Sequence, residues 1–425
     1  MKRSIYAHRS TGFTLVEVLV SSALLVFIMV LVLSTVDQTQ RVWRRAASKV
    51  TQFQSARNAF ESMTRRLSQA TLNTYYRSFD EDISTETAQF TYTRESELQF
   101  MTGPTAKIMT SPALAGLPAD PERAYPTHSI FFTAPLGFTS ERDLSITTAY
   151  VPKFRNLNSA LVATGYFLEH GEDPDVPKTL RDAGLVPSKR RYRLMELDVP
   201  TENLSIYRRP LDITDQVRRY KNDPQILDSS KSEYVGLIDR NRQPSTTWSR
   251  PLWMEEALLR ESNEEGSGAS GFTFKNTRVL AENIVALVLL PKLPQKDREV
   301  PGRMDDLSPF FMYDSWRILA QDPKQKQRAA RYNQLPPIIS VTMIAIDEPS
   351  ALRVADQYKE DLPDWSEGLF QRVGTEEEFR EEIKELEERL TKDPAKIAYR
   401  TFSTDVVIRG SKWSRDANIF IFDKQ

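Results

Sequence analysis

The chain has 425 residues and is almost neutral, with 57 Lys and Arg against 58 Asp and Glu. A balance of this kind gives no indication of a nucleic-acid partner. The sequence has no cysteine, which excludes disulfides and thiolate metal sites. The length is sufficient for one large domain or two in addition to a membrane segment.

The first predicted element is an apolar helix over residues 13–36. This stretch is uncharged except for Glu17, and a membrane-spanning helix needs about 20 mostly apolar residues. An ionised carboxylate inside the apolar layer costs roughly 2.5–3.5 kcal/mol on insertion scales. Glu17 is therefore a candidate functional residue, because a buried carboxylate is tolerated mainly when a cation meets it.

The order of the segments favours a particular kind of leader. A secretory signal would place a small-residue cleavage site after the apolar run, but Leu33-Ser34-Thr35-Val36 continues directly into Asp37. Here Lys2, Arg3 and Arg9 precede Gly12, and Phe13-Thr14-Leu15-Val16-Glu17 opens the helix. An ordinary anchor is the plainer alternative.

That arrangement resembles the class III signal of type IV pilins and type II secretion pseudopilins. The resemblance implies that a prepilin peptidase cuts between Gly12 and Phe13 and methylates the new amine of Phe13. It also implies that Glu17 faces the Phe13 ammonium of a neighbouring subunit in a filament. The implied location is the bacterial inner membrane, with a cytoplasmic N-terminus and a periplasmic head. Charge counting alone would not favour this orientation, because Arg41, Arg44, Arg45 and Lys49 follow the span closely.

Apolar residues continue beyond the span at steps of three or four, which is helical amphipathic spacing. These residues are Trp43, Ala46, Val50, Phe53, Ala56, Phe60, Met63, Leu67 and Ala70. We therefore expect one helix from Phe13 to Leu72. The predicted organisation is a leader over residues 1–12, a transmembrane half over 13–36, an amphipathic half over 37–72 and an extracytoplasmic head over 73–425.

The head is predicted to be rich in β-strands, since segments of Val, Ile, Phe, Tyr and Thr alternate with turn residues. The expected strands are 89–93, 97–101, 129–133, 144–151, 160–169, 192–199, 204–208, 284–290, 338–346 and 404–409. No helices alternate with them, so the fold class is α+β, with the long helix packed on a mainly antiparallel sheet. Residues 209–275 are polar and are interpreted as an irregular insertion. Residues 375–392 form a predicted helix with a Thr375–Glu378 capping box and a Pro394 stop.

Further segments narrow the resemblance to a smaller group. They are residues 59–73, 160–167, 279–290 and 336–353, the last with Ile346-Asp347-Glu348. Together they resemble the Verru_Chthon cassette protein C family of prepilin-type proteins. The helical stripe of Phe60, Met63 and Leu67 is also similar to that of the larger minor pseudopilins of the J type.

Three groups of residues are candidates for a chemical site. Gly266 to Gly271 matches G-x-G-x-x-G but lacks the strand before it and the helix after it that a dinucleotide site needs. His8, His128 and His170 have no metal-ligand spacing. The acids of 80–82 and Asp347-Glu348 could bind Ca²⁺, although solvated acids at element ends are the simpler interpretation.

The sequence thus leads to a structural subunit that is not an enzyme and has no cofactor or metal. Its expected partners are a prepilin peptidase and other prepilin-type subunits. The bulky head favours a minor subunit, because many such heads are hard to stack closely. The alternative is a membrane-anchored extracytoplasmic enzyme or binding protein that uses a pilin-like anchor.

Overall fold

The computed structural model describes most of the N-terminal helix and the ordered part of the head. The described residues are 14–80, 90–96, 98–109, 124–137, 159–172, 190–201, 260–262, 272–274, 277–298, 307–315, 333–358, 365–413 and 420–422, with a few single positions between these ranges. The chain divides into two compact units, Met1–Gln52 and Phe53–Gln425. Of the predicted insertion over 209–275, only two short strands are described.

Helix α1 runs without interruption from Leu15 to Leu67, as expected for a segment without glycine or proline. The expected end at Leu72 is wrong by five residues. After Leu67 the backbone tightens, because the amides of Gln69 and Ala70 donate to the carbonyls of Arg66 and Leu67, each at 3.0 Å. Such bonds between residues three apart satisfy the last carbonyls of a helix and end it.

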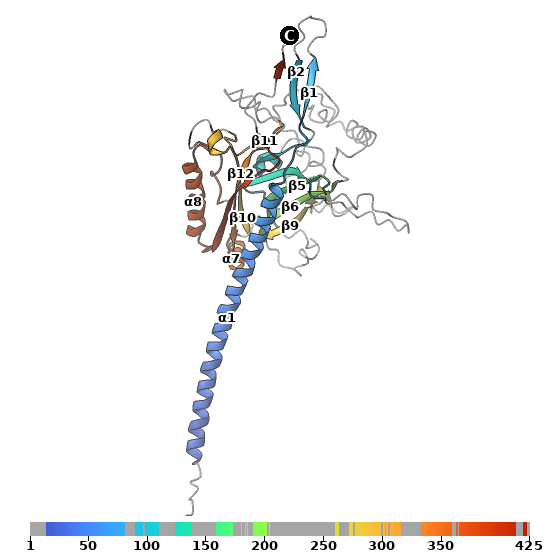
Figure 1. Cartoon of the computed structure of the whole chain (residues 1–425). Coiled ribbons are helices and arrows are strands. Elements are labelled where there is room, and N and C mark those ends of the chain that lie inside the picture. Colours follow the sequence, from blue (N-terminus) through green and yellow to red (C-terminus); the bar gives the residue numbers. More distant parts are fainter. Residues whose placement is uncertain are drawn as a thin grey trace, which may run out of the picture. The chain divides into compact units, whose positions relative to one another are not determined.

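The head is built on two main antiparallel sheets (Figure 1). The six-stranded sheet has the order β11-β3-β4-β5-β6-β9, and the three-stranded sheet has the order β10-β12-β13. The strands of the first are β3 (Met101–Pro104), β4 (His128–Ala134), β5 (Val162–Gly171), β6 (Arg191–Val199), β9 (Thr277–Glu282) and β11 (Tyr313–Asp314). Those of the second are β10 (Ile284–Lys292), β12 (Ile338–Ile346) and β13 (Tyr399–Val407).

Two small sheets complete the described strands. One joins β1 (Tyr75–Asp80), β2 (Phe90–Glu95) and β14 (Phe420–Phe422), and the other joins β7 (Arg260–Ser262) and β8 (Phe272–Phe274). Every pairing among the described strands is antiparallel. The expectation of an α+β chain with mainly antiparallel sheets is confirmed at this level.

Individual strand predictions vary in accuracy. The strand over 338–346 has the predicted bounds, while β13 begins at Tyr399 rather than at Thr404. The predicted strand over 97–101 is wrong, because β3 begins only at Met101. The predicted strand over 144–151 lies outside the described residues, as does that over 204–208 except for Leu204. Strands β1, β7, β8, β9, β11 and β14 are not among the predicted strands.

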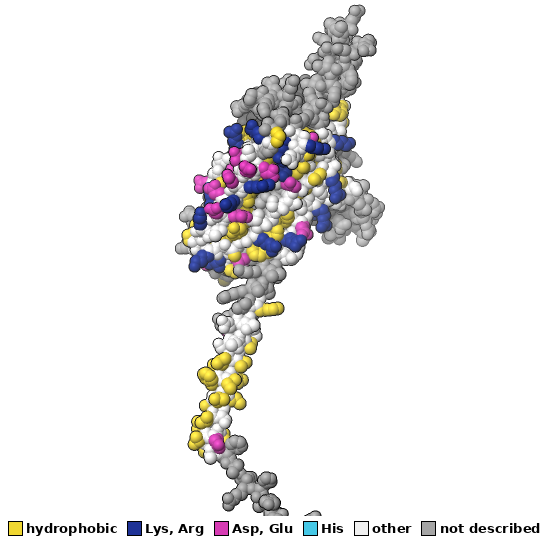
Figure 2. Space-filling view, turned by 60° about the vertical axis from the view of Figure 1, so that its left-hand side comes forward, with side chains coloured by type: hydrophobic (Ala, Val, Ile, Leu, Met, Phe, Trp, Pro, Cys, Tyr) yellow, Lys and Arg dark blue, Asp and Glu magenta, His cyan; other side chains and the backbone are white. Residues whose placement is uncertain are grey.

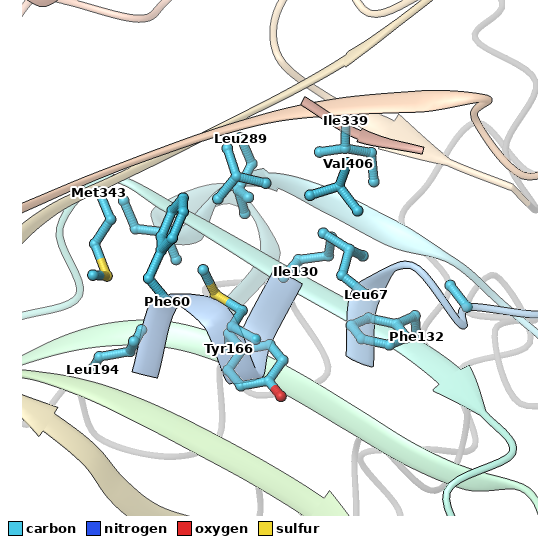
Figure 3. Close-up of a cluster of buried hydrophobic side chains, with 14 of the residues drawn as sticks. Phe60, Leu67, Ile130, Phe132, Tyr166, Leu194, Leu289, Ile339, Met343 and Val406 are labelled. Carbon is cyan, nitrogen blue, oxygen red and sulfur yellow. The ribbon is translucent and has the colours of Figure 1, made fainter. Parts of the chain in front are cut away.

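The last turns of α1 cover the place where the two main sheets meet. Its buried residues Ala56, Ala59, Phe60, Met63 and Leu67 form one stripe and share a core with both sheets. Figure 3 shows Leu289, Ile339 and Val406 on one side of this helix and Tyr166, Phe132 and Leu194 on the other. Phe60 contacts Phe402 of β13 with the ring centroids 5.9 Å apart. The helix therefore packs on two sheets rather than on the single sheet that was expected.

The two sheets are connected by one residue. Asn283 lies between β9 and β10 with φ of 61°, a left-handed conformation that asparagine adopts more readily than most residues. Its amide donates to the Tyr192 carbonyl at 2.7 Å, and its own carbonyl accepts from the Ile346 amide at 2.9 Å. Asn283 thus bonds to one strand of each sheet.

Helices α7 (Glu348–Tyr358) and α8 (Glu376–Lys392) cover the other face of the three-stranded sheet. The predicted capping box of α8 is confirmed, since the Thr375 hydroxyl accepts from the Glu378 amide at 3.2 Å and the Glu378 carboxylate accepts from the Thr375 amide at 2.9 Å. Phe379, Leu386 and Leu390 of α8 are buried in the head. The apolar stripe of α8 therefore packs against the head of its own chain.

Candidate membrane-spanning and assembly segment

The N-terminal part of α1 is apolar on all sides. Residues Leu15–Gln40 form a strongly apolar helical segment, and their side chains are exposed rather than buried within the chain. Figure 2 shows hydrophobic side chains along the visible face of this segment. By length and composition the segment could cross a membrane, and a signal sequence near an N-terminus would have the same properties.

Glu17 takes part in a helix cap. The Thr14 amide and the Thr14 hydroxyl each donate to Oε2 of Glu17 at 3.0 Å, and the Glu17 amide donates to the Thr14 hydroxyl at 3.3 Å. This reciprocal pattern is a capping box, which satisfies amides that the first turn of a helix leaves unpaired. This role was not predicted, although Thr14-Leu15-Val16-Glu17 has the T-x-x-E spacing that signals it.

Other hydroxyl groups of the segment are also satisfied inside the helix. Ser22 donates to the Leu19 carbonyl at 2.9 Å, and Thr35 donates to the Val32 carbonyl at 2.8 Å. Polar groups in an apolar layer are expensive unless they are hydrogen-bonded. Because their hydroxyl groups are bonded to backbone carbonyls of the same helix, Ser22 and Thr35 are compatible with a hydrocarbon environment.

The leader, Gly12 and Phe13 lie outside the described residues. The predicted cleavage and methylation therefore remain predictions, as does the predicted role of Glu17 toward a neighbouring Phe13 ammonium. Among the motif residues that the structure describes, Thr14 is the one that forms hydrogen bonds with the Glu17 side chain.

A buried charge network attaches the end of α1 to the six-stranded sheet. Glu196 of β6 is fully buried, and it accepts hydrogen bonds from Tyr166 at 2.8 Å and from Nε of Arg278 at 2.6 Å. Arg66 of α1 contacts Glu196 at 2.9 Å and Asp198 at 3.0 Å. Burial and the adjacent Glu196 carboxylate raise the pKa of Tyr166. Two guanidinium groups thus balance two carboxylates, which suits a structural attachment rather than a reactive site.

The two described histidines are held in their neutral form. Burial lowers the pKa of His128 to about 4. Nδ1 of His128 accepts from the Leu289 amide at 3.1 Å. Burial also lowers the pKa of His170 to about 4, and the neighbouring Arg190 and Arg193 lower it further. His128 packs against Phe311 and His170 against Tyr192, so both histidines belong to the core.

The acids that were weighed as Ca²⁺ ligands have other partners. Asp347 is buried and accepts from the Ser350 amide at 2.9 Å, which places it at the start of α7. Glu348 pairs with Arg191 at 2.5 Å and accepts from Nδ2 of Asn283 at 2.9 Å. The interpretation of this pair as solvated acids is therefore wrong. Of the acids at 80–82, only Asp80 is described, as the last residue of β1.

Within the described part of the chain, no group of three or more histidines or carboxylates is arranged to hold a metal ion. Residues 266–271 lie outside the described residues. Comparisons with family models, curated proteins and solved structures give no match for this chain.

Proposed function

We propose that the chain is a minor pilin-like or pseudopilin-like structural subunit, processed by a prepilin peptidase and assembled beside other prepilin-type subunits in an envelope filament. The observation that carries the proposal is the N-terminal order: a short basic leader, Gly12-Phe13, a carboxylate at Glu17 and an apolar helix. This helix continues unbroken to Leu67.

The packing of the head supports the same proposal. The stripe of α1 is anchored in the head by Met63, Leu67 and the Arg66 contacts with β6. The apolar segment Leu15–Gln40 contributes no buried residues to the chain's own core. A helix with one half fixed in a head and the other half free to contact lipid or other helices is the form that a filament subunit requires.

The first experiment tests processing. The full chain is expressed with and without a prepilin peptidase, and its intact mass and N-terminal peptide are measured. We expect a chain that begins at methylated Phe13 only when the peptidase is present, and no processing of the Gly12→Leu variant. A mature N-terminus at Met1 or beyond Val36 in the presence of the peptidase would exclude the class III interpretation.

The second experiment separates the two roles open to Glu17. Glutamine at this position keeps a capping box but removes the charge, whereas Thr14→Val removes the cap partner and keeps the carboxylate. If Glu17 pairs with a cation of a neighbouring subunit, Glu17→Gln lowers incorporation and Thr14→Val has little effect. If Glu17 serves only as a cap, the order of the two effects is reversed.

Incorporation can be measured by crosslinking, since the chain has no cysteine of its own. A Leu24→Cys substitution provides one reactive site on the apolar segment. The yield of crosslinks to similarly labelled prepilin-type subunits is then compared among the natural residue, Glu17→Gln and Thr14→Val. Membrane insertion of each variant, measured by carbonate extraction, is the control. Equal yields in all three would remove the main physical support for assembly through Glu17.

A further inference from the structure

A basic segment of α1 follows directly after the apolar segment. Between Asp37 and Glu61 the chain contains five basic residues and no acidic one. Four of them, Arg41, Arg44, Arg45 and Lys49, lie within the N-terminal compact unit, where the backbone is continuously helical. The packed part of α1 in the head contains an acid among its bases, and Arg57 pairs with this residue, Glu61, at 2.7 Å.

The spacing of these bases places them on one side of the helix. At about 100° per residue, Arg44, Arg41, Arg45 and Lys49 fall within an arc of about 140°. Trp43 lies at about 200° from Arg41, on the arc that also contains Val42, Ala46 and Val50. Trp43 is 75% exposed. The segment is therefore amphipathic, with a basic side and an apolar side that includes an aromatic residue.

The distance from the apolar segment fits the surface of a bilayer. The uncharged stretch after Glu17 covers Val18 to Val36 and is about 28 Å long, close to the thickness of one hydrocarbon core. Arg41 and Arg45 then lie roughly 7 and 14 Å beyond its end. This is within about one Debye length of the headgroup layer at 0.1 M salt.

We propose that residues 41–50 of α1 bind the anionic headgroups of the bilayer that the apolar segment crosses, through the basic arc. Trp43 lies at the depth where aromatic residues are enriched at membrane interfaces. The proposal rests on membrane insertion of Leu15–Gln40, but not on processing at Gly12 or on assembly through Glu17. Clusters of basic residues beside a span are attracted to anionic lipid, and each residue near the surface contributes roughly a fivefold preference.

The test uses the full chain reconstituted in phosphatidylcholine vesicles. Spin-labelled phosphatidylglycerol and spin-labelled phosphatidylcholine serve as probes, and electron paramagnetic resonance gives the ratio of their association with the protein. For the natural chain we expect a preference for phosphatidylglycerol of roughly fivefold or more at low salt. The preference should fall strongly near 1 M salt, where the Debye length is about 3 Å.

Matched variants locate the effect. Arg44→Gln together with Arg45→Gln should lower the ratio several-fold, because two of the four bases of the arc remain, while Arg44→Lys with Arg45→Lys should retain it because the charge remains. The control is Arg57→Gln with Arg65→Gln, which removes two bases from the head portion of the same helix and should leave the ratio unchanged. All chains are compared at equal amounts of inserted protein.

Three outcomes would overturn the proposal: a natural chain without lipid preference, an unchanged ratio in the Arg44 and Arg45 glutamine variant, or an equal loss in the control. If the basic arc pairs instead with acidic residues of a second copy, the glutamine variant would change self-association and leave the lipid ratio at one throughout. Failure of the natural chain to insert at all would contradict the transmembrane part of the proposed function, which carbonate extraction detects separately.

Discussion

Two stretches of the same helix, Leu15–Gln40 and residues 53–67, have the same backbone and opposite environments. Leu24 is 61% exposed, whereas Leu67 is fully buried. The difference follows from the distribution of apolar residues around the helix and not from their number. In the first stretch they surround the helix, so that only lipid or other helices can cover them. In the second they form one stripe, which the two sheets of the head cover completely.

The largest expected effect concerns the charge network that ends the buried stretch. Glu196→Gln removes the charge of a buried carboxylate that contacts Arg66, Arg278 and Tyr166, and hydrogen bonds to a charged group contribute roughly 1.5–3 kcal/mol each. The measurement is chemical denaturation of the head. Glu61→Gln is the control, because Glu61 forms an exposed pair with Arg57, and such pairs contribute about 0–1 kcal/mol. Equal effects of the two substitutions would contradict the assigned role of burial.

The second largest expected effect on the stability of the head is that of a leucine-to-alanine substitution, which can be compared between the two stretches. Leu67→Ala should destabilise the head by about 2–5 kcal/mol, because it leaves a cavity in the core. Leu24→Ala should leave the thermal unfolding of the head unchanged, since the residue is not part of that core. Both are measured on the full chain in the same detergent. A shift of similar size for Leu24→Ala would mean that the apolar segment packs on the head.

The stability of the head should also depend on pH. In the unfolded chain the histidines have a pKa near 6.5, and in the folded head His128 and His170 have a pKa of about 4. The unfolded state therefore binds more protons between these values. The stabilising contribution of neutral histidine is complete above about pH 6.5 and is lost as the pH falls toward 4.

This prediction can be checked by denaturation at pH 7.5 and pH 4.5. His128→Gln and His170→Gln should each reduce the loss of stability between the two pH values, even if they lower the stability at pH 7.5. An unchanged pH dependence in both variants would show that carboxylates and not these histidines control it.

The smallest expected effect is that of removing the apolar stretch. A truncated chain that begins at Gln40 keeps all the buried residues of α1, so we expect a soluble head with mixed helix and sheet in its circular dichroism. Its melting temperature should equal that of the head in the full chain. An insoluble product, or a large change in melting temperature, would mean that the two stretches are not independent.

The sequence predicted those parts of the fold that depend on local periodicity. The stripe from Ala56 to Leu67 and the Thr375 cap were both readable, because helical spacing and capping are set by residues within one or two turns. The β12 strand was readable for a similar reason, since a run of apolar β-branched residues is typical of a strand covered on both faces.

The parts that the sequence did not reveal depend on distant contacts. Arg66, Glu196 and Arg278 come from three elements, and no local pattern indicates that their side chains meet. Helix α7 was missed because its Asp347 cap was interpreted as one member of an acidic pair. The Thr14–Glu17 cap was also missed, although its signal was local, because the resemblance of the segment suggested a different role for the carboxylate.

The single-residue connection at Asn283 limits how this chain can change. One inserted residue between β9 and β10 would move β10 by one position against β12. The side chains of β10 that now fill one core cluster would then point into the other. Replacement by a β-branched residue would be strained at a φ of 61°. Among relatives of this protein, we therefore expect length variation to avoid this junction, and position 283 to be restricted to asparagine, aspartate or glycine.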